Sequence, residues 1–428
     1  MQTYVNPPRN QWDELLQRPQ LDVSGLYEQV QSVLDEIEVA GDQAVLKYSR
    51  MFDGYEGAEL QVGEEEIAAA SSKITKELKS AIETAAQNIK TFHATQWQLM
   101  EKVETQPGVT CWQKNVPIEK VGLYVPGGTA PLFSTVLMLG VPAKIAGCRE
   151  IILCTPPGKD GKIHPAILYA ASVAGIDKIY KIGGIQAIGA MTFGTESVPK
   201  VYKIFGPGNK YVTAAKQLVS LKNMAIDMPA GPSEVLIMAD ESANPAFVAA
   251  DLLSQAEHGA GSQVILLTTV PELLDAVMAE VEKQVKSLPR EDGARGALND
   301  SRAFLLTSID EMIKMSDLYA PEHLILAVND AEEVADRIIN AGSVFIGHYT
   351  PESAGDYASG TNHTLPTYGH ARTYSGVNID SYIRKVTFQH ITPEGLKQLG
   401  PVIQEMAAAE MLDAHKNAVT IRLNEIGD

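Results

Sequence analysis

Cysteine, positive charge and long apolar runs are all scarce in this sequence of 428 residues. Each shortage argues against a class of protein. The three cysteines, Cys111, Cys148 and Cys154, include no pair at the C-x-x-C spacing, and such sparse usage suits a reducing compartment. No run of about 18 apolar residues occurs, and the polar N-terminus lacks the apolar core of a signal peptide. We therefore expect a cytoplasmic protein without a membrane span.

Positive charge is outnumbered, because 35 Lys and Arg residues stand against 53 Asp and Glu residues, for a formal net charge of -18. A nucleic-acid surface needs clustered Lys and Arg, so we expect no nucleic-acid partner. A local site on an acidic protein can still attract an anionic small ligand. At 45% hydrophobic and 21% charged residues, the composition is that of a globular protein with large cores.

Short apolar runs alternate with helical patterns through the middle of the chain, which is typical of βαβ units and parallel sheets. The predicted fold class is α/β, with two Rossmann-like domains at residues 121–230 and 231–348. We expect the mostly helical segment 1–120 to pack on the second of them. The polar stretch 349–392 is expected to be a functional loop region. Residues 393–428 return to helical spacing and are predicted to form a small helical extension.

Polar and ionisable side chains gather at the ends of predicted elements. Gln255 and His258 are three residues apart at a helix end, so they share a face, although a histidine there also suits the helix dipole. Glu322 and His323 precede an apolar strand, where two ionisable groups suggest a site. Strand neighbours normally alternate, but Pro321 makes the start irregular, so both side chains could face one pocket.

The remaining candidates have stronger structural alternatives. Asp356 and His363 lie in a Gly/Ser-rich loop, where an aspartate is commonly a turn residue. Glu410 and His415 are five residues apart in the tail, and on a straight helix they would sit about 140° apart. They could share a site only if the chain bends between them. Ser233 lies at the tip of the turn GPSEV, which feeds a strand.

Two glycine-rich turns, VGLYVPGGTAP and IFGPGN, follow predicted strands. Such turns let a backbone approach phosphates closely. Neither fits G-x-G-x-x-G, so the usual dinucleotide-binding pattern is absent. The turns alone are weak indications of a nucleotide site.

Seven segments, in this order and over nearly the whole chain, resemble histidinol dehydrogenases. They are VGLYVPGGTAPLFSTVLML, IFGPGNKYV, DMPAGPSEVL, DLLSQAEHG, YAPEHL, SAGDYASGTNHTLPT and EMLDAHKNAV. The resemblance implies a zinc enzyme that uses two NAD to oxidise L-histidinol to L-histidine through histidinaldehyde. It also implies a homodimer with shared active sites, in which the tail 393–428 reaches the partner subunit. The first α/β domain would contact NAD, and the second would carry the metal and catalytic residues.

Carried onto matching positions, the resemblance gives each candidate a role. Glu322 and His323 would be the catalytic acid–base residues. The implied zinc ligands are Gln255, His258, Asp356 and His415. The implied substrate contacts are Ser233, Gln255, His258, His323, Asp356, Glu410 and His415, with His363 as a possible neighbour. The implied NAD contacts are Tyr124, Gln186 and Asn209; Ile185 stands beside them where an alanine is expected.

The implied ligand set is chemically coherent. One carboxylate, one neutral amide and two neutral imidazoles leave a net charge of about +1 on Zn²⁺, unlike closed structural sites, which tend to be rich in cysteine. The imidazole and amine of the substrate are both good zinc donors once deprotonated. Two other readings remain open at this point. One is a metal-dependent hydrolase that uses the same ligands, and the other is a non-catalytic homologue that acts as an interaction protein.

Overall fold

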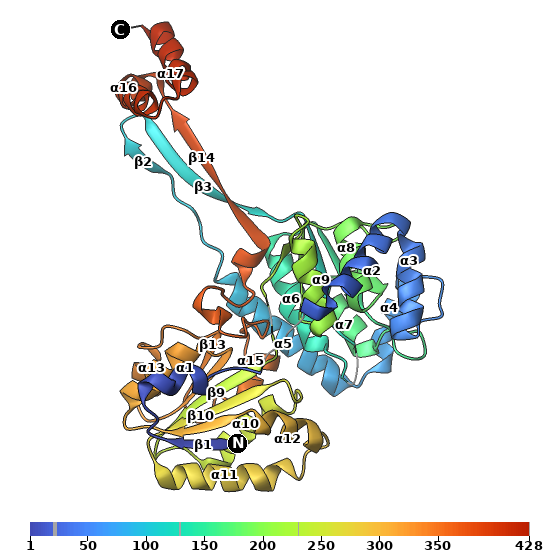
Figure 1. Ribbon diagram of the computed structural model, residues 1–428. Helices are drawn as coiled ribbons and strands as arrows, with labels where there is room; N and C mark the ends of the chain where they lie inside the picture. Colours follow the sequence, from blue (N-terminus) through green and yellow to red (C-terminus); the bar gives the residue numbers. More distant parts are fainter. Residues whose placement is uncertain (20–23, 128–129, 230, 428) are drawn as a thin grey trace. The chain divides into compact units, whose positions relative to one another are not determined.

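The computed structural model describes residues 1–19, 24–127, 130–229 and 231–427, and the chain divides into two units (Figure 1). The first unit comprises Met1–Gln96 and Glu119–Ser381, and the second comprises Trp97–Ile118 and Tyr382–Asp428. Among the described residues, no helix is both long enough and apolar enough to cross a membrane.

Two parallel sheets form the framework of the first unit. Their strands are short apolar runs, and β9 and β10 are buried along their whole length, as expected for parallel strands covered on both faces. The six-stranded sheet has the order β1 (Gln2–Val5), β11 (Arg302–Leu305), β10 (Gln263–Thr268), β9 (Glu234–Ala239), β12 (His323–Ala327), β13 (Ser343–Ile346). The five-stranded sheet has the order β6 (Lys178–Lys181), β5 (Glu150–Thr155), β4 (Lys120–Tyr124), β7 (Lys203–Phe205), β8 (Ala225–Ile226). The predicted α/β class with parallel sheets is confirmed.

Helices connect these strands, and local sequence fixes several of their ends. Pro245 begins α10, where the side chain of Asn244 accepts a hydrogen bond from the Ala246 amide, and left-handed Gly147 and Gly175 follow α6 and α7. The helices around the five-stranded sheet include α6 (Phe133–Ala146), α7 (Pro165–Ala174), α8 (Gly184–Phe193) and α9 (Lys210–Ser220). Those of the six-stranded sheet include α10 (Pro245–Ala256), α11 (Pro271–Val285), α12 (Glu291–Asn299), α13 (Ile309–Tyr319) and α14 (Ala331–Ala335).

The expectation that segment 1–120 packs on the second α/β domain is wrong for most of its length. Only its start belongs there, because β1 pairs with β11 and Trp12 of α1 (Trp12–Leu15) is buried in that core. The following helices pack on α6, α7, α8 and α9 of the other sheet; they are α2 (Tyr27–Ala40), α3 (Asp42–Tyr48), α4 (Glu64–Ala70) and α5 (Lys76–Ala94) (Figure 1). Apolar spacing shows that a helix has a buried face, but it carries no information about which sheet covers that face.

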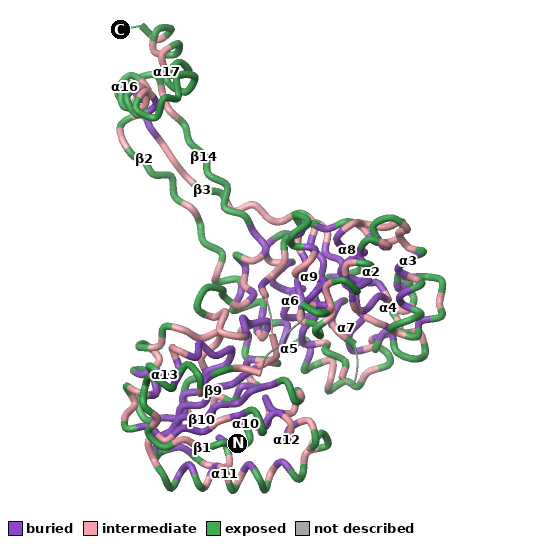
Figure 2. The backbone as a smooth tube through the Cα atoms, in the orientation of Figure 1, coloured by how far each residue is buried: buried purple, intermediate pink, exposed green. Residues whose placement is uncertain are grey.

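The stretch 349–392 is not a continuous loop, and the tail that follows it forms two helices. The stretch contains α15 (Glu352–Tyr357) and β14 (Ile383–Ile391). In the second unit β14 joins β3 (Val109–Pro117) and β2 (Val103–Gln106) in an antiparallel sheet, with α16 (Pro393–Ala409) packed against α17 (Asp413–Ile426). Most of β14 is exposed, so its sequence lacks the buried alternate positions by which a strand is predicted (Figure 2).

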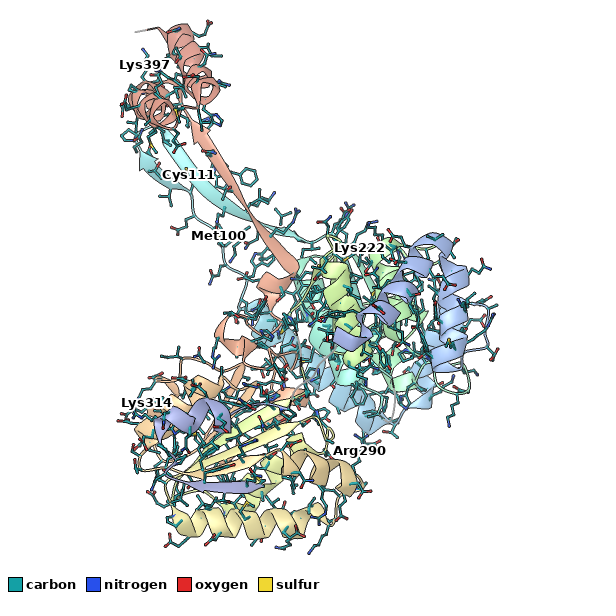
Figure 3. All side chains as sticks on the ribbon, in the orientation of Figure 1. Met100, Cys111, Lys222, Arg290, Lys314 and Lys397 are labelled. Carbon is teal, nitrogen blue, oxygen red and sulfur yellow. The ribbon has the colours of Figure 1, made fainter. Side chains whose placement is uncertain are left out.

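None of the three cysteines, all of which the structure describes, forms a disulfide. Cys111 lies on β3 of the second unit (Figure 3), whereas Cys148 and Cys154 are buried in the first unit. Burial raises the pKa of the Cys148 thiol to about 12. That thiol therefore behaves as a small apolar side chain rather than as a nucleophile.

Candidate active site

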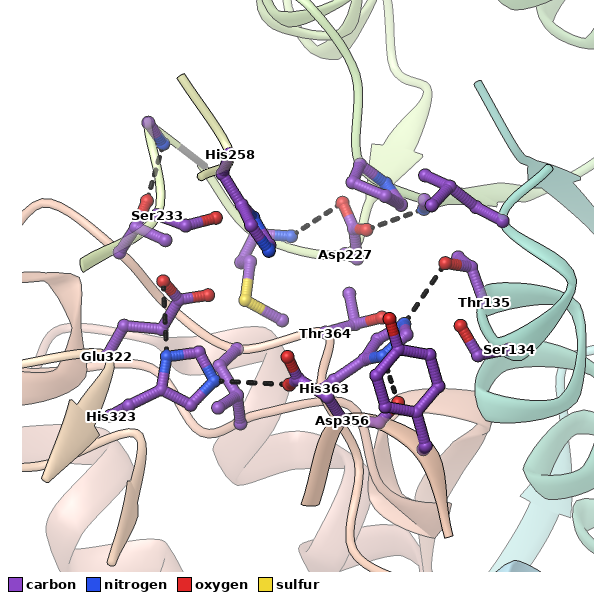
Figure 4. A pocket seen from close by; sticks show the side chains of 18 residues that line it. Ser134, Thr135, Asp227, Ser233, His258, Glu322, His323, Asp356, His363 and Thr364 are labelled. Carbon is purple, nitrogen blue, oxygen red and sulfur yellow. Dashed lines mark hydrogen bonds and ion pairs between the residues drawn. The ribbon is translucent and has the colours of Figure 1, made fainter. Parts of the chain in front are cut away.

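One pocket of the first unit is lined by six predicted residues, namely Ser233, His258, Glu322, His323, Asp356 and His363 (Figure 4). Ser233 and Glu322 directly precede the neighbouring parallel strands β9 and β12, so both lie at the amino edge of the six-stranded sheet. Gly206 and Asp227, which follow β7 and β8, bring the carboxyl edge of the five-stranded sheet to the same pocket. Carboxyl edges of parallel sheets are common ligand sites.

Glu322 and His323 are both held by the backbone of Glu234. The Glu234 amide donates to Oε2 of Glu322 at 2.9 Å, and Nδ1 of His323 lies 3.1 Å from the Glu234 carbonyl oxygen. A carbonyl oxygen can only accept, so Nδ1 carries the hydrogen and a neutral ring keeps its lone pair on Nε2. Nε2 has no hydrogen-bond partner among the described residues, and it lies 3.5 Å from Oδ1 of Asp356. The imidazole is thus oriented with its basic nitrogen toward Asp356.

Three carboxylates surround this imidazole, which is only 3% exposed. The Nδ1 atom lies 3.6 Å from Oε2 of Glu322 and 3.9 Å from Oε1 of Glu352, whereas Nε2 lies 3.5 Å from Oδ1 of Asp356. Burial raises the pKa of both Glu322 and Glu352, each to about 8. Burial alone would lower the pKa of His323, but Glu322, Glu352 and Asp356 raise it. The cluster can therefore take up and release protons near neutral pH.

Gln255 lies in the last turn of α10, and His258 lies two residues past its end. Gln255 is fully buried, and neither Oε1 nor Nε2 has a hydrogen-bond partner among the described residues. An orphaned buried amide is unfavourable by about 1–3 kcal/mol, and a bound cation at Oε1 would relieve part of that. Burial lowers the pKa of His258, which favours the neutral imidazole that binds metals. Burial would raise the pKa of Asp356, but His323 lowers it, so the carboxylate stays ionised. The donors of these three residues fit a zinc-type ion.

Glu352 was not among the predicted site residues. A ligand atom of His323, one of Glu352 and one of Asp356 all lie within 4.8 Å of one another, and Oε2 of Glu352 has no partner among the described residues. The two carboxylates are four residues apart on α15, which places them on one helix face. That spacing is visible in the sequence, but the Gly/Ser-rich context favoured a loop, so it was not read as a helix.

His363 bridges two walls of the pocket. Its Nδ1 lies 2.8 Å from the Asp356 carbonyl oxygen, to which it donates, and its Nε2 lies 3.1 Å from Oγ1 of Thr135 (Figure 4). Burial lowers the pKa of His363, so it remains neutral beside Asp356. Thr135 was not among the predicted residues.

Glu410 and His415 belong to the second unit, whereas every other predicted site residue belongs to the first. Both are exposed. Between them α16 ends at Ala409, Met411 adopts a left-handed φ of 59°, and α17 begins at Asp413. The chain therefore bends between the two residues, as a shared role requires.

The three predicted NAD contacts, Tyr124, Gln186 and Asn209, line a second pocket of the first unit, at the carboxyl edge of the five-stranded sheet. The Tyr124 hydroxyl accepts from the Gly184 amide at 3.1 Å, and Nε2 of Gln186 donates to Asp53 at 2.7 Å. Asn209 also caps α9, so its side chain has a structural role as well. Ile185 lines the same pocket, and Asp53 is a further lining residue that the sequence analysis missed.

A parallel α/β framework with a buried imidazole–carboxylate pair, metal-type donors and a second pocket at a sheet edge defines an α/β enzyme of the dehydrogenase type. The model of the histidinol dehydrogenase family matches residues 16–423. The chain is 62% identical to a histidinol dehydrogenase of Bacteroides thetaiotaomicron over 420 residues, which are 98% of each chain. It is 51% identical to that of Escherichia coli, over 96% of this chain and 95% of the other.

A crystal structure of histidinol dehydrogenase from Elizabethkingia anophelis superimposes with a TM-score of 0.98 at 56% identity, covering 100% of this chain and 99% of that one. This chain belongs to the histidinol dehydrogenase family. The predicted family and the predicted class of enzyme, an oxidoreductase, are confirmed.

Proposed function

We propose that this protein catalyses the zinc-dependent, NAD-linked four-electron oxidation of L-histidinol to L-histidine through histidinaldehyde. The observation that carries the proposal is the orientation of His323, whose Nδ1–H is bound to the Glu234 carbonyl while Nε2 faces the Asp356 carboxylate in the pocket. A base so fixed is suited to removing the proton of an alcohol as its carbon gives up a hydride. The names of the relatives supply the substrate, histidinol.

In the first oxidation Nε2 of His323 accepts the hydroxyl proton of histidinol while the hydride leaves carbon for NAD, giving the aldehyde. Glu322, beside His323, then removes a proton from water as the water oxygen adds to the aldehyde carbon, and protonated His323 returns its proton to the carbonyl oxygen to give the hydrate. In the second oxidation His323 takes a hydroxyl proton of the resulting hydrate, and a second hydride leaves for a second NAD. The carboxylate is formed without a covalent enzyme intermediate, which agrees with the buried, protonated thiol of Cys148.

The proposed metal ligands are Gln255, His258, Asp356 and His415 of a partner subunit. Zn²⁺ held by these residues would supply a Lewis acid for the imidazole and amine of the substrate. Ser233, His363 and Glu410 are proposed substrate contacts, and Tyr124, Gln186 and Asn209 are proposed NAD contacts. The bend between α16 and α17 supports a tail that presents Glu410 and His415 together. A cytoplasmic homodimer with shared sites completes the proposal.

The test is the absorbance of NADH after L-histidinol and NAD are added to the zinc-loaded protein. The proposal expects NADH to accumulate and histidine to appear as the product. A protein that releases no NADH with histidinol, but hydrolyses esters or amides of histidine, would instead be a metal-dependent hydrolase.

A further inference from the structure

A buried arginine lies behind the catalytic pair, at the end of the first described segment. Arg18 donates from Nε and Nη2 to the two carboxylate oxygens of Glu234, at 2.5 and 2.9 Å. The side chains of Arg18 and Glu234 are only 13% and 2% exposed. The Tyr319 hydroxyl and the Tyr368 amide donate to the same carboxylate, at 2.9 and 3.1 Å. Glu234 is therefore held from three directions by charge-assisted hydrogen bonds.

Arg18 also holds the turn that leads to Glu322. Its Nη2 donates to the carbonyl oxygens of Tyr319 and Ala320, at 2.7 and 3.4 Å, and its guanidinium lies 3.8 Å from the centroid of the Tyr319 ring. Ala320 has a left-handed φ of 52°, which is strained for a residue with a side chain and persists only where the surroundings impose it. Glu322 and His323, which follow Ala320 by two and three residues, line the pocket.

One guanidinium thus joins the start of β9 to the start of β12. At the first, the backbone of Glu234 binds both catalytic side chains. At the start of β12, the strained turn at Ala320 determines the backbone position from which both side chains extend. We infer that Arg18 is a positioning residue, which fixes Glu322 and His323 relative to each other through Glu234 and the turn at Ala320. Arg18 itself does not line the substrate pocket.

The planar fork of arginine is essential to this arrangement. Lysine keeps the charge but offers a single point donor, so it cannot bind both Glu234 oxygens and the Tyr319 carbonyl in the same geometry. Arg18→Lys therefore retains a cation for the buried carboxylate, which protects the fold, and removes the fixed link between the strands. Arg295→Lys is the matched control, because Arg295 also makes a bidentate contact with a glutamate, Glu282, but is partly exposed and does not line the pocket.

The first measurement is kinetic, and it rests on the proposed function. For Arg18→Lys, kcat should fall about 10- to 100-fold with both histidinol and histidinaldehyde, because a displacement of about 1 Å in a reacting group has an effect of that size. The KM values for histidinol and NAD should stay within about threefold, since the groups that bind them are unchanged. Arg295→Lys should match the wild type in both constants.

The second measurement needs no substrate. The imidazole nitrogen and hydrogen NMR signals of His323, assigned by their loss in His323→Gln, report the Nδ1–H bond to Glu234 at one fixed pH. They should shift in Arg18→Lys and stay in place in Arg295→Lys. If the wild type oxidises no histidinol but the His323 signals shift in Arg18→Lys, the proposed function fails and the positioning role stands. The inference is overturned if the His323 signals of Arg18→Lys stay in place and kcat falls only in proportion to the fraction of folded protein. Arg18 would then be a structural residue.

Discussion

Oε1 of Glu352 lies 3.9 Å from Nδ1 of His323, and Glu352 is only 1% exposed. A carboxylate in that position has lost its hydration without gaining a full set of partners, because its Oε2 has none among the described residues. The relationship has a consequence for stability as well as for chemistry. It makes the metal-free protein sensitive to pH in a predictable direction.

Burial raises the pKa of Glu352 to about 8, from about 4.3 in an unfolded chain. Between these values the folded protein binds more protons than the unfolded one, so Glu352 lowers stability progressively as pH rises, with the full effect above about pH 8. Glu352→Gln removes this ionisation. In chelated protein its melting temperature should exceed that of the wild type by a margin that is smallest near pH 5 and largest near pH 9. Glu64→Gln, at an exposed position of α4, controls for the substitution, and a margin independent of pH would refute the account.

Removal of the metal should abolish activity and leave the fold intact. The proposed ligands come from separate segments, and none of them belongs to the large apolar cores of the first unit. Far-ultraviolet circular dichroism should be unchanged after chelation, while NADH formation stops and returns when Zn²⁺ is restored. Global unfolding on chelation at moderate temperature would mean that the metal is structural.

His323→Ala should slow both oxidation steps by about 10²- to 10⁴-fold, because the same base serves each hydride transfer. Glu322→Gln should mainly impair oxidation of added histidinaldehyde, since Glu322 is proposed to activate water. Rates with histidinol and with histidinaldehyde, measured separately by NADH release, distinguish the two roles. Equal losses on the alcohol and the aldehyde in Glu322→Gln would remove the division of labour.

A shared active site predicts complementation between two inactive variants, His323→Ala and His415→Ala. In a mixed dimer one site receives both defects and the other receives neither. Random pairing yields about half mixed dimers, so about a quarter of wild-type activity should return after co-expression or co-refolding. Activity that stays at the level of the single variants would show that His415 serves its own chain.

The elements that could be predicted from the sequence are those with a regular apolar pattern or a clear capping signal. The apolar runs at β9 and β10, and the helix start at Asn244 and Pro245, carry local signals of strand burial and of capping. The pairing of Glu322 with His323 was also foreseeable, because Pro321 disturbs the alternation at the start of β12. The family could be predicted from the seven matching segments.

What the sequence could not predict depends on contacts between distant residues or on exposed elements. Arg18 and Glu234 are 216 positions apart, and nothing local in either residue indicates the other. Strand β14 is exposed along most of its length, so it has no apolar alternation to detect. Glu352 lies on a helix of only 6 residues, too short for a periodic pattern to outweigh its loop-like composition.

The most direct test of the central claim is the amount of NADH formed when histidinol is limiting and NAD is in excess. The zinc-loaded protein should release two NADH for each L-histidinol consumed, with L-histidine as the final product and no free aldehyde accumulating. A yield of one NADH per histidinol, with histidinaldehyde as the product, would contradict the four-electron reaction and the role assigned to Glu322.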